Sequence, residues 1–161
     1  MFWKITGKDY HLVTGDGTHQ MQKSQVEQGV IPGILAYDDG VPVGWIAVEP
    51  RNEYPRLARS RVLKPVDDAE VWSVTCFFTA RSHRRKGITV ELLREAIKYV
   101  SSRGGKIIEG YPVAPKGDNA PDVFVFTGLP GAFLKAGFTE VARFSPTRPI
   151  FRYVINSETG R

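Results

Sequence analysis

Three consecutive basic residues, Arg84, Arg85 and Lys86, stand directly before Gly87 near the middle of the chain. The preceding residues 71–79 are β-branched and aromatic on both faces and predict a buried strand, whereas residues 88–100 repeat apolar side chains at helical spacing. The first N–H groups of a helix lack intrahelical partners, and the helix dipole adds about half a positive charge there. Gly87 would let the backbone approach a ligand closely. The sequence therefore predicts a site for a phosphate or diphosphate at this strand–loop–helix junction.

The composition is that of an ordinary globular protein of 161 residues, with 42% hydrophobic and 24% charged residues. A chain of this length is expected to form one domain over residues 1–161. The single cysteine, Cys76, excludes an internal disulfide framework, and no apolar run approaches the roughly 18 residues of a membrane span. We therefore expect a cytoplasmic protein.

The net charge of +5 favours anionic partners, but most basic residues are spread over the chain. Because no nucleic-acid-binding module accompanies them, nucleic-acid binding is only a third hypothesis, and it predicts binding that weakens steeply with salt. His11, His19 and His83 lack the spacing of metal ligands, and the sequence contains no nucleophile elbow, P-loop or dinucleotide fingerprint. We expect no metal, nucleic-acid or membrane partner.

The order of the expected elements predicts an α/β (α+β) fold with a mixed, mostly antiparallel sheet and flanking helices. Asp39-Gly40 predicts a tight hairpin, because both turn positions need a positive φ. A strand that follows the helix at 88–100 should lie parallel to the strand at 71–79, through a right-handed crossover. Residues 50–68 are expected to form a surface excursion. The other expected elements are strands at 33–37, 41–48, 106–111, 138–144 and 149–155 and helices at 18–28 and 130–136.

The basic loop resembles the acetyl-CoA loop of the GNAT superfamily of N-acetyltransferases, whose pattern is Gln/Arg-x-x-Gly-x-Gly/Ala. Arg84 and Gly87 match this pattern, whereas Thr89 departs from it, because the family prefers a residue with little or no side chain there. A second segment, at 131–138, is similar to the family helix that ends in a Gly-Phe pair before the last strands. The resemblance implies a GNAT-like sheet in which the parallel strand pair splays apart.

The resemblance also implies acetyl-CoA as co-substrate, with its diphosphate on the backbone N–H groups of the loop and its pantetheine arm beside the preceding strand. A thioester held between the splayed strands would be attacked directly by a primary amine of a small molecule or peptide. A homodimer is left open. The residues implied to bind the coenzyme are Phe77, Phe78, Thr79, Arg84, Arg85, Lys86, Gly87, Ile88 and Thr89.

The catalytic groups are less well defined by the sequence. Glu109 and Tyr111 follow the parallel strand and are the candidates for proton transfer, while Glu49 lies on a neighbouring strand. Glu109 and Tyr111 could also have purely structural roles, Glu109 as the partner of an arginine and Tyr111 as a packing residue. Cys76 is interpreted as an inert core thiol.

Many family members carry a tyrosine on the last short helix to protonate the leaving thiolate, and this chain has Phe133 at that position. Either another group supplies the proton or the thiolate leaves unaided. The alternative function is a non-catalytic acyl-CoA-binding or sensing domain. Residues 51–68 and the loop at 112–121 are predicted to shape the acceptor pocket.

Overall fold

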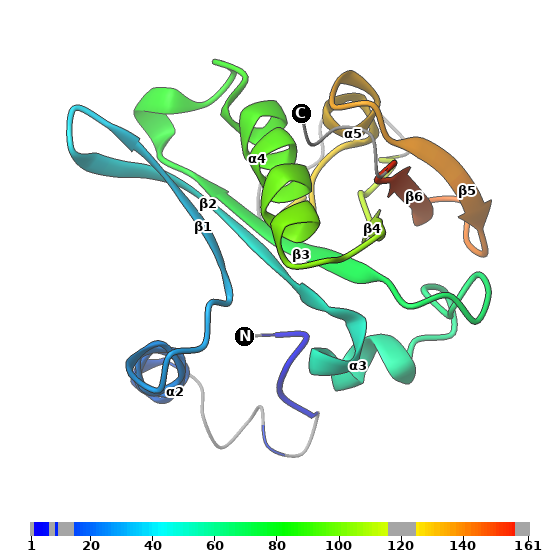
Figure 1. Ribbon diagram of the computed structural model, residues 1–161, viewed down its shortest axis with the longest axis horizontal. Coiled ribbons are helices and arrows are strands. Elements are labelled where there is room, and N and C mark those ends of the chain that lie inside the picture. Colours follow the sequence, from blue (N-terminus) through cyan, green and yellow to red (C-terminus); the bar gives the residue numbers. More distant parts are fainter. Residues whose placement is uncertain (1, 7–8, 10–14, 116–124, 157–161) are drawn as a thin grey trace.

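The computed structural model describes residues 2–6, 9, 15–115 and 125–156 (Figure 1). Its strands are β1 (Gly33–Asp38), β2 (Val41–Pro50), β3 (Trp72–Thr79), β4 (Ile107–Gly110), β5 (Thr139–Arg143) and β6 (Pro149–Val154). Its helices are α2 (Asp16–Glu27), α3 (Pro55–Ala58), α4 (Ile88–Ser102) and α5 (Pro130–Lys135), with 3-10 turns η1 (Arg51–Glu53) and η2 (Arg81–His83).

The strands form one six-stranded sheet in the order β1-β2-β3-β4-β6-β5. Each neighbouring pair is antiparallel except β3 and β4, which pair in parallel. The predicted mixed, mostly antiparallel sheet with one parallel pair is therefore confirmed. The parallel ladder joins only residues 72–74 to residues 108–110, so the rest of β3 runs on without β4 beside it.

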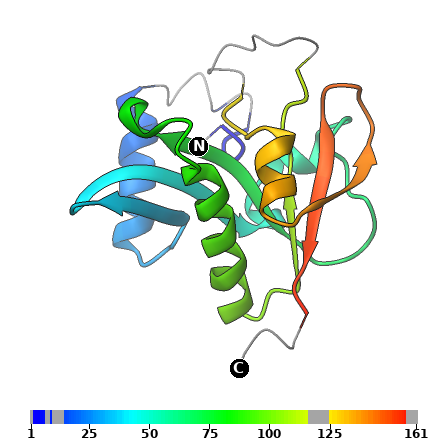
Figure 2. The same cartoon turned by 90° about the horizontal axis from the view of Figure 1, so that it is seen from above.

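Local sequence signals explain the framework around β3. The β1–β2 hairpin turns at Asp39 and Gly40, which both have the positive φ that this turn requires, 47° and 78°. The stripe of Leu92, Leu93, Ala96 and Val100 buries one face of α4 against the sheet. Figures 1 and 2 show α4 and α5 on one face of the sheet and the N-terminal segment with α3 on the other.

The segment between β2 and β3 packs more deeply than the sequence suggested. Leu57 and Leu63 are fully buried and, with Tyr54, Tyr111 and Ile150, form a second apolar cluster on the face opposite α4. The prediction of a surface excursion at 50–68 is therefore wrong for its apolar residues. The segment is rich in polar side chains, and the few apolar residues that anchor it are too irregularly spaced to form a periodic pattern.

We predict that Gly110→Ala destabilises the protein by about 1–3 kcal/mol, the range expected for overpacking a core. A Cβ at this position would lie 2.0 Å from Cε1 of Phe133, a side chain that is itself fully buried. The measurement is urea unfolding of the purified variant. Gly131→Ala in α5 is the control, because its Cβ would meet nothing within 4 Å, and its stability should equal or slightly exceed that of the wild type.

Candidate functional site

The basic loop ends at a helix start that faces solvent. Gly87 is the N-cap of α4 with φ 83°, and no side-chain hydrogen bond caps the helix. The Gly87 carbonyl accepts hydrogen bonds from the N–H groups of Val90 (2.9 Å) and Glu91 (3.2 Å), as at any helix start. Arg85 also adopts a left-handed φ of 63°. Two left-handed residues therefore turn the chain so that the first helical N–H groups lie beside exposed cationic side chains.

The loop itself is tied to the rest of the sheet. His83 bonds through Nε2 to a carboxylate oxygen of Asp38 at 2.8 Å and through Nδ1 to the Ser82 hydroxyl at 2.9 Å. Arg84 donates from Nε to the Thr79 carbonyl at 3.3 Å. These contacts connect the loop to the β1–β2 hairpin and to the end of β3. His83 thus serves to position the loop in this conformation.

A groove of about 790 Å³ runs from the start of α4 along the open edge of β3. Of the nine residues predicted to bind the coenzyme, eight line this groove, and Lys86 is not part of its lining. The opposite wall comes from the segment before α5 and from α5 itself. That wall consists of Val125, Phe126, Gly128, Leu129, Gly131, Ala132 and Lys135.

The sequence reasoning missed this opposite wall. Lys135, in the last turn of α5, adds a cation to the groove. Phe126 lies beside β3 and accepts a hydrogen bond from the Phe77 N–H at 2.7 Å. No local pattern could have found either residue, because both reach the groove through contacts with segments far away in the sequence.

An irregularity in β3 redirects its side chains beside the groove. Ala47 pairs with Cys76 and Val48 pairs with Val74, so Thr75 is an extra residue without a partner on β2. A bulge of this kind shifts the alternation of side chains along a strand. Phe77 accordingly packs against the core that α4 covers, where its ring meets that of Phe133 edge to face with centroids 6.0 Å apart.

The candidates Glu109 and Tyr111 lie elsewhere. Both residues are almost completely buried, and neither lines the groove. The Glu109 carboxylate accepts from Arg152 Nε at 2.7 Å and from the Tyr111 hydroxyl at 2.9 Å, and it pairs with Arg51 at 3.3 Å. The Ser73 hydroxyl lies 2.7 Å from the Tyr111 hydroxyl. The structure thus brings both candidates together in one buried ionic network, away from the basic loop.

The surroundings of Tyr111 and Asp67 shift the pKa values of both groups. Burial, and then the neighbouring Glu109 carboxylate, raise the pKa of the Tyr111 phenol above its ordinary value. Arg152 extends the network to the surface, where its guanidinium donates to both oxygens of Asp67 and lowers the pKa of that carboxyl to about 2. Tyr111 therefore remains a neutral hydrogen-bond donor at physiological pH.

We predict that Cys76 reacts slowly with iodoacetamide at neutral pH. Burial raises the pKa of its thiol, and only the thiolate reacts rapidly. The rate should rise severalfold in urea, which exposes the side chain. Mass spectrometry of the alkylated protein measures both rates, and equal rates in the folded and unfolded states would contradict the prediction.

The comparisons with known proteins agree with this geometry. The sequence matches the Acetyltransferase (GNAT) family over residues 5–121, and the chain belongs to this family. Among proteins with curated functions, none matches the sequence.

Solved structures of the same fold were found at low sequence identity. The chain is similar to ribosomal-protein-alanine N-acetyltransferase from Brucella melitensis (17% identity, TM-score 0.54, covering 87% of this chain and 78% of that chain). It is also similar to yncA, a putative acetyltransferase from Salmonella typhimurium with its cofactor acetyl-CoA (14%, 0.54, 89% and 75%). A third is PaiA N-acetyltransferase from Thermoplasma acidophilum in complex with coenzyme A (13%, 0.54, 92% and 74%).

The groove has the features that a diphosphate requires. It combines an uncapped helix start, a left-handed glycine with open space beside it and the cations Arg84, Arg85 and Lys135.

In the described part of the chain, no group of three or more histidine, cysteine or acidic residues could hold a metal ion. Within the same residues, no helix combines the length and apolar character needed to cross a membrane.

Proposed function

We propose that this protein is an acetyl-CoA-dependent N-acetyltransferase that transfers an acetyl group to a primary amine by direct attack. The observation that carries the proposal is the groove between α4, β3 and α5, with the uncapped start of α4 and exposed cations at one end. Family membership supports acetyl transfer. The names of the solved relatives, which include a ribosomal-protein-alanine N-acetyltransferase, support an amine as acceptor.

Each part of the groove has a proposed task. The N–H groups from Arg85 to Thr89 bind the diphosphate, and the neighbouring cations neutralise its charge. The open edge of β3 at Phe77, Phe78 and Thr79 binds the pantetheine arm. The Phe77 N–H, which now donates to Phe126, is positioned to donate to the thioester carbonyl once that segment is displaced.

Proton transfer by Glu109 and Tyr111 stays a prediction. Both groups are buried in the ionic network with Arg51 and Arg152, so a direct contact with an amine requires that the network open. Glu49, at the end of β2, is the other carboxylate considered for this role. It is buried but lies at a second cavity.

A second candidate function is a non-catalytic acyl-CoA-binding or sensing domain. Phe133 favours it, because the residue that stands at the position of the family's tyrosine carries no hydroxyl and is completely enclosed by the core. A protein of this kind would bind the acyl-CoA and release none of its thiol. The same groove would bind the acyl-CoA in both functions.

Two measurements separate these functions. Acetyl-CoA at 100 times its dissociation constant should stabilise the protein by about 2.7 kcal/mol, measured as a rise in melting temperature. Release of free coenzyme A thiol in the presence of a panel of primary amines should then exceed the rate without amine. Stabilisation without thiol release would favour the sensing domain, and absence of both would contradict the proposed coenzyme site.

Three further properties belong to the same proposal. Residues 1–161 form one acyltransferase domain, of which the family match covers residues 5–121. A single cysteine is consistent with the reducing cytoplasm. The acceptor is an amine on a small molecule or a peptide, and a homodimer is compatible with the exposed apolar side chains Leu35, Tyr37 and Val41 of the β1–β2 hairpin.

A further inference from the structure

A second cavity, of about 190 Å³, lies on the face of the sheet opposite α4. Twelve described residues line it, mainly from the N-terminal segment, β2 and β3, and five of them are aromatic: Phe2, Trp3, Trp45, Tyr54 and Phe126. A cavity of roughly 150 Å³ holds one benzene ring, so this one has room for a short apolar stem or a single ring. It is too small for a large ligand to enter entirely.

Among the described residues that line this cavity, Glu49 supplies the one carboxylate and Lys4 the one ammonium group. Lys4 Nζ is 2.7 Å from one carboxylate oxygen of Glu49 and 2.6 Å from the other. The Tyr54 hydroxyl donates to Glu49 at 3.3 Å, and the Lys4 ammonium lies 5.9 Å from the centre of the Tyr54 ring. The side chains of Glu49 and Lys4 are only 6% and 12% exposed. A carboxylate this deeply buried needs a cationic partner, and aromatic faces attract cations as well.

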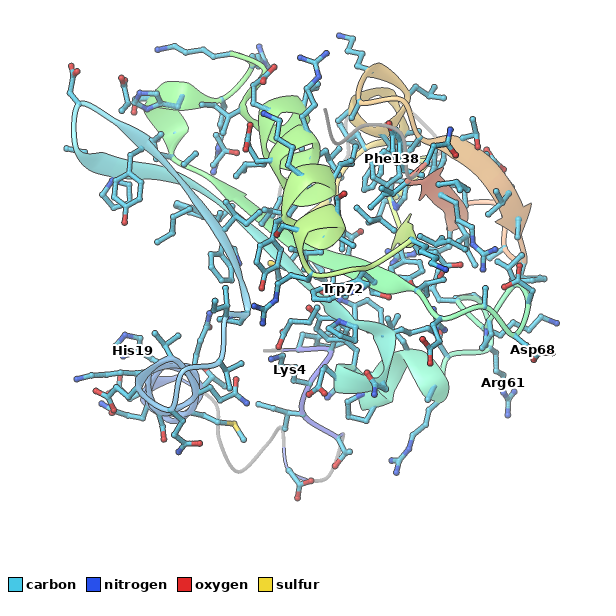
Figure 3. All side chains as sticks on the ribbon, in the orientation of Figure 1. Lys4, His19, Arg61, Asp68, Trp72 and Phe138 are labelled. Carbon is cyan, nitrogen blue, oxygen red and sulfur yellow. The ribbon has the colours of Figure 1, made fainter. Side chains whose placement is uncertain are left out.

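Figure 3 shows where that ammonium comes from. Lys4 belongs to the N-terminal segment, which passes between α2 and α3 on the side of the sheet away from α4. The segment is not part of the sheet, and its Lys4 side chain reaches the Glu49 carboxylate. The cation partner of Glu49 is therefore supplied by a part of the chain that could leave without breaking any strand pairing.

The cavity is adjacent to the proposed coenzyme groove. Phe126 lines both spaces, and its carbonyl accepts the hydrogen bond from the Phe77 N–H on the open edge of β3. Thr75 and Cys76, the two residues at the β3 bulge, also line the cavity. Phe126 thus separates this cavity from the edge of β3 at which the thioester is proposed to lie.

We propose that this cavity binds the acceptor as a primary alkylammonium group on a short apolar stem, with Glu49 as its ionic partner. In the structure Lys4 occupies that position as an internal competitor, which an acceptor must displace. The inference rests on the proposed function only where it calls the bound amine an acceptor. The binding of amines to Glu49 can be tested without acetyl-CoA. A free alkylamine and the lysine side chain of a peptide share this chemistry.

The test is chemical rescue of Lys4→Met, which removes the charge and shortens the side chain by one heavy atom. The variant leaves Glu49 buried without a cation, so its melting temperature should fall by roughly 6–20 °C. Millimolar n-pentylamine, whose five carbons match those of a lysine from Cα to Cε, should restore most of the loss, whereas 1-pentanol should not. Lys23→Met in α2, which removes a cation from an exposed pair with Glu27, is the matched control and should show neither effect.

Two further arms keep the test decisive. In Lys4→Met/Glu49→Gln, which buries no unpaired charge, rescue by n-pentylamine should disappear. In wild-type protein labelled with ¹³C at the lysine Cε, n-pentylamine should move the Lys4 resonance toward that of an exposed lysine, which tests displacement even if the variant does not fold. Nα-acetyl-lysine methylamide distinguishes a free alkylamine from the lysine side chain of a peptide. If it rescues the variant as n-pentylamine does, the site also accepts lysine side chains of peptides.

Equal effects of n-pentylamine and 1-pentanol, together with an unmoved Lys4 resonance, would overturn the proposal. None of these readouts requires acetyl transfer. A protein that acetylates amines yet shows no rescue would refute the amine site alone. A protein that shows rescue yet releases no thiol would refute the transferase and leave the amine site standing.

Discussion

Replacing Gly87 with aspartate is expected to weaken coenzyme A binding about a thousandfold. A carboxylate near 4 Å from a phosphate charge costs about 4 kcal/mol at the effective dielectric of a protein surface. The fold should survive, because aspartate is a favourable N-cap, interacts well with the helix dipole and tolerates a left-handed φ better than most residues. The Cβ also meets nothing within 4 Å. Isothermal titration calorimetry with coenzyme A measures the effect.

Gly87→Asn is the matched control, because it has the same shape as the aspartate variant and the same demand for a left-handed φ, without the charge. It should lose about tenfold in affinity or less, the cost of a modest steric adjustment. Wild-type affinity in Gly87→Asp would show that the start of α4 is not the diphosphate site. Equal losses in both variants would point to shape as the cause and would contradict the electrostatic account.

Glu109→Ala is expected to destabilise the protein by about 3–5 kcal/mol, the range for removing one partner of a buried ion pair. The Glu109 side chain is 1% exposed, and its loss would leave Arg51 and Arg152 without their buried counter-charge. Arg152 would keep Asp67, so Arg51 should account for most of the cost. Urea unfolding followed by tryptophan fluorescence gives the free energy directly.

Glu95→Ala is the control for this second prediction, because Glu95 pairs with Lys98 on the exposed side of α4 and should change stability by less than about 0.5 kcal/mol. Glu109→Gln adds a test of the predicted catalytic role. Turnover of Glu109→Gln is measured at a low temperature at which the variant is fully folded. If Glu109 accepts a proton in the reaction, this turnover will fall steeply. If it only holds the two arginines, turnover per folded molecule will stay within a few fold, and the proton-transfer prediction will be wrong.

The residues that line one side of the groove could be predicted because their signals are local. A buried strand, a basic loop with a glycine and an amphipathic helix follow one another within residues 71–100, and the structure places eight of the nine predicted residues along one groove. The parallel pairing of β3 and β4 follows from chain order and the handedness of crossovers. These features depend on neighbours in sequence and require no knowledge of distant contacts.

The remaining parts depend on contacts between distant residues. Glu109 meets Arg51 and Arg152 across 58 and 43 positions of the chain, and Lys4 meets Glu49 across 45. No periodicity relates these residues, so a single sequence could name the carboxylates but not their partners. Part of the loop predicted to shape the acceptor pocket, residues 116–121, lies outside the described residues. The cavity proposed for the acceptor is lined in part by the N-terminal segment and by Tyr54 from the 51–68 segment.

The most direct test of the account is a ¹H–¹⁵N NMR titration of the protein with coenzyme A, because it observes the main-chain N–H groups that are proposed to bind the diphosphate. We predict saturable shifts that are largest at Gly87, Ile88 and Thr89, with smaller changes at Phe77 as the Phe126 carbonyl is displaced. Saturation of the protein with coenzyme A while the amides at the start of α4 keep their positions would contradict the account.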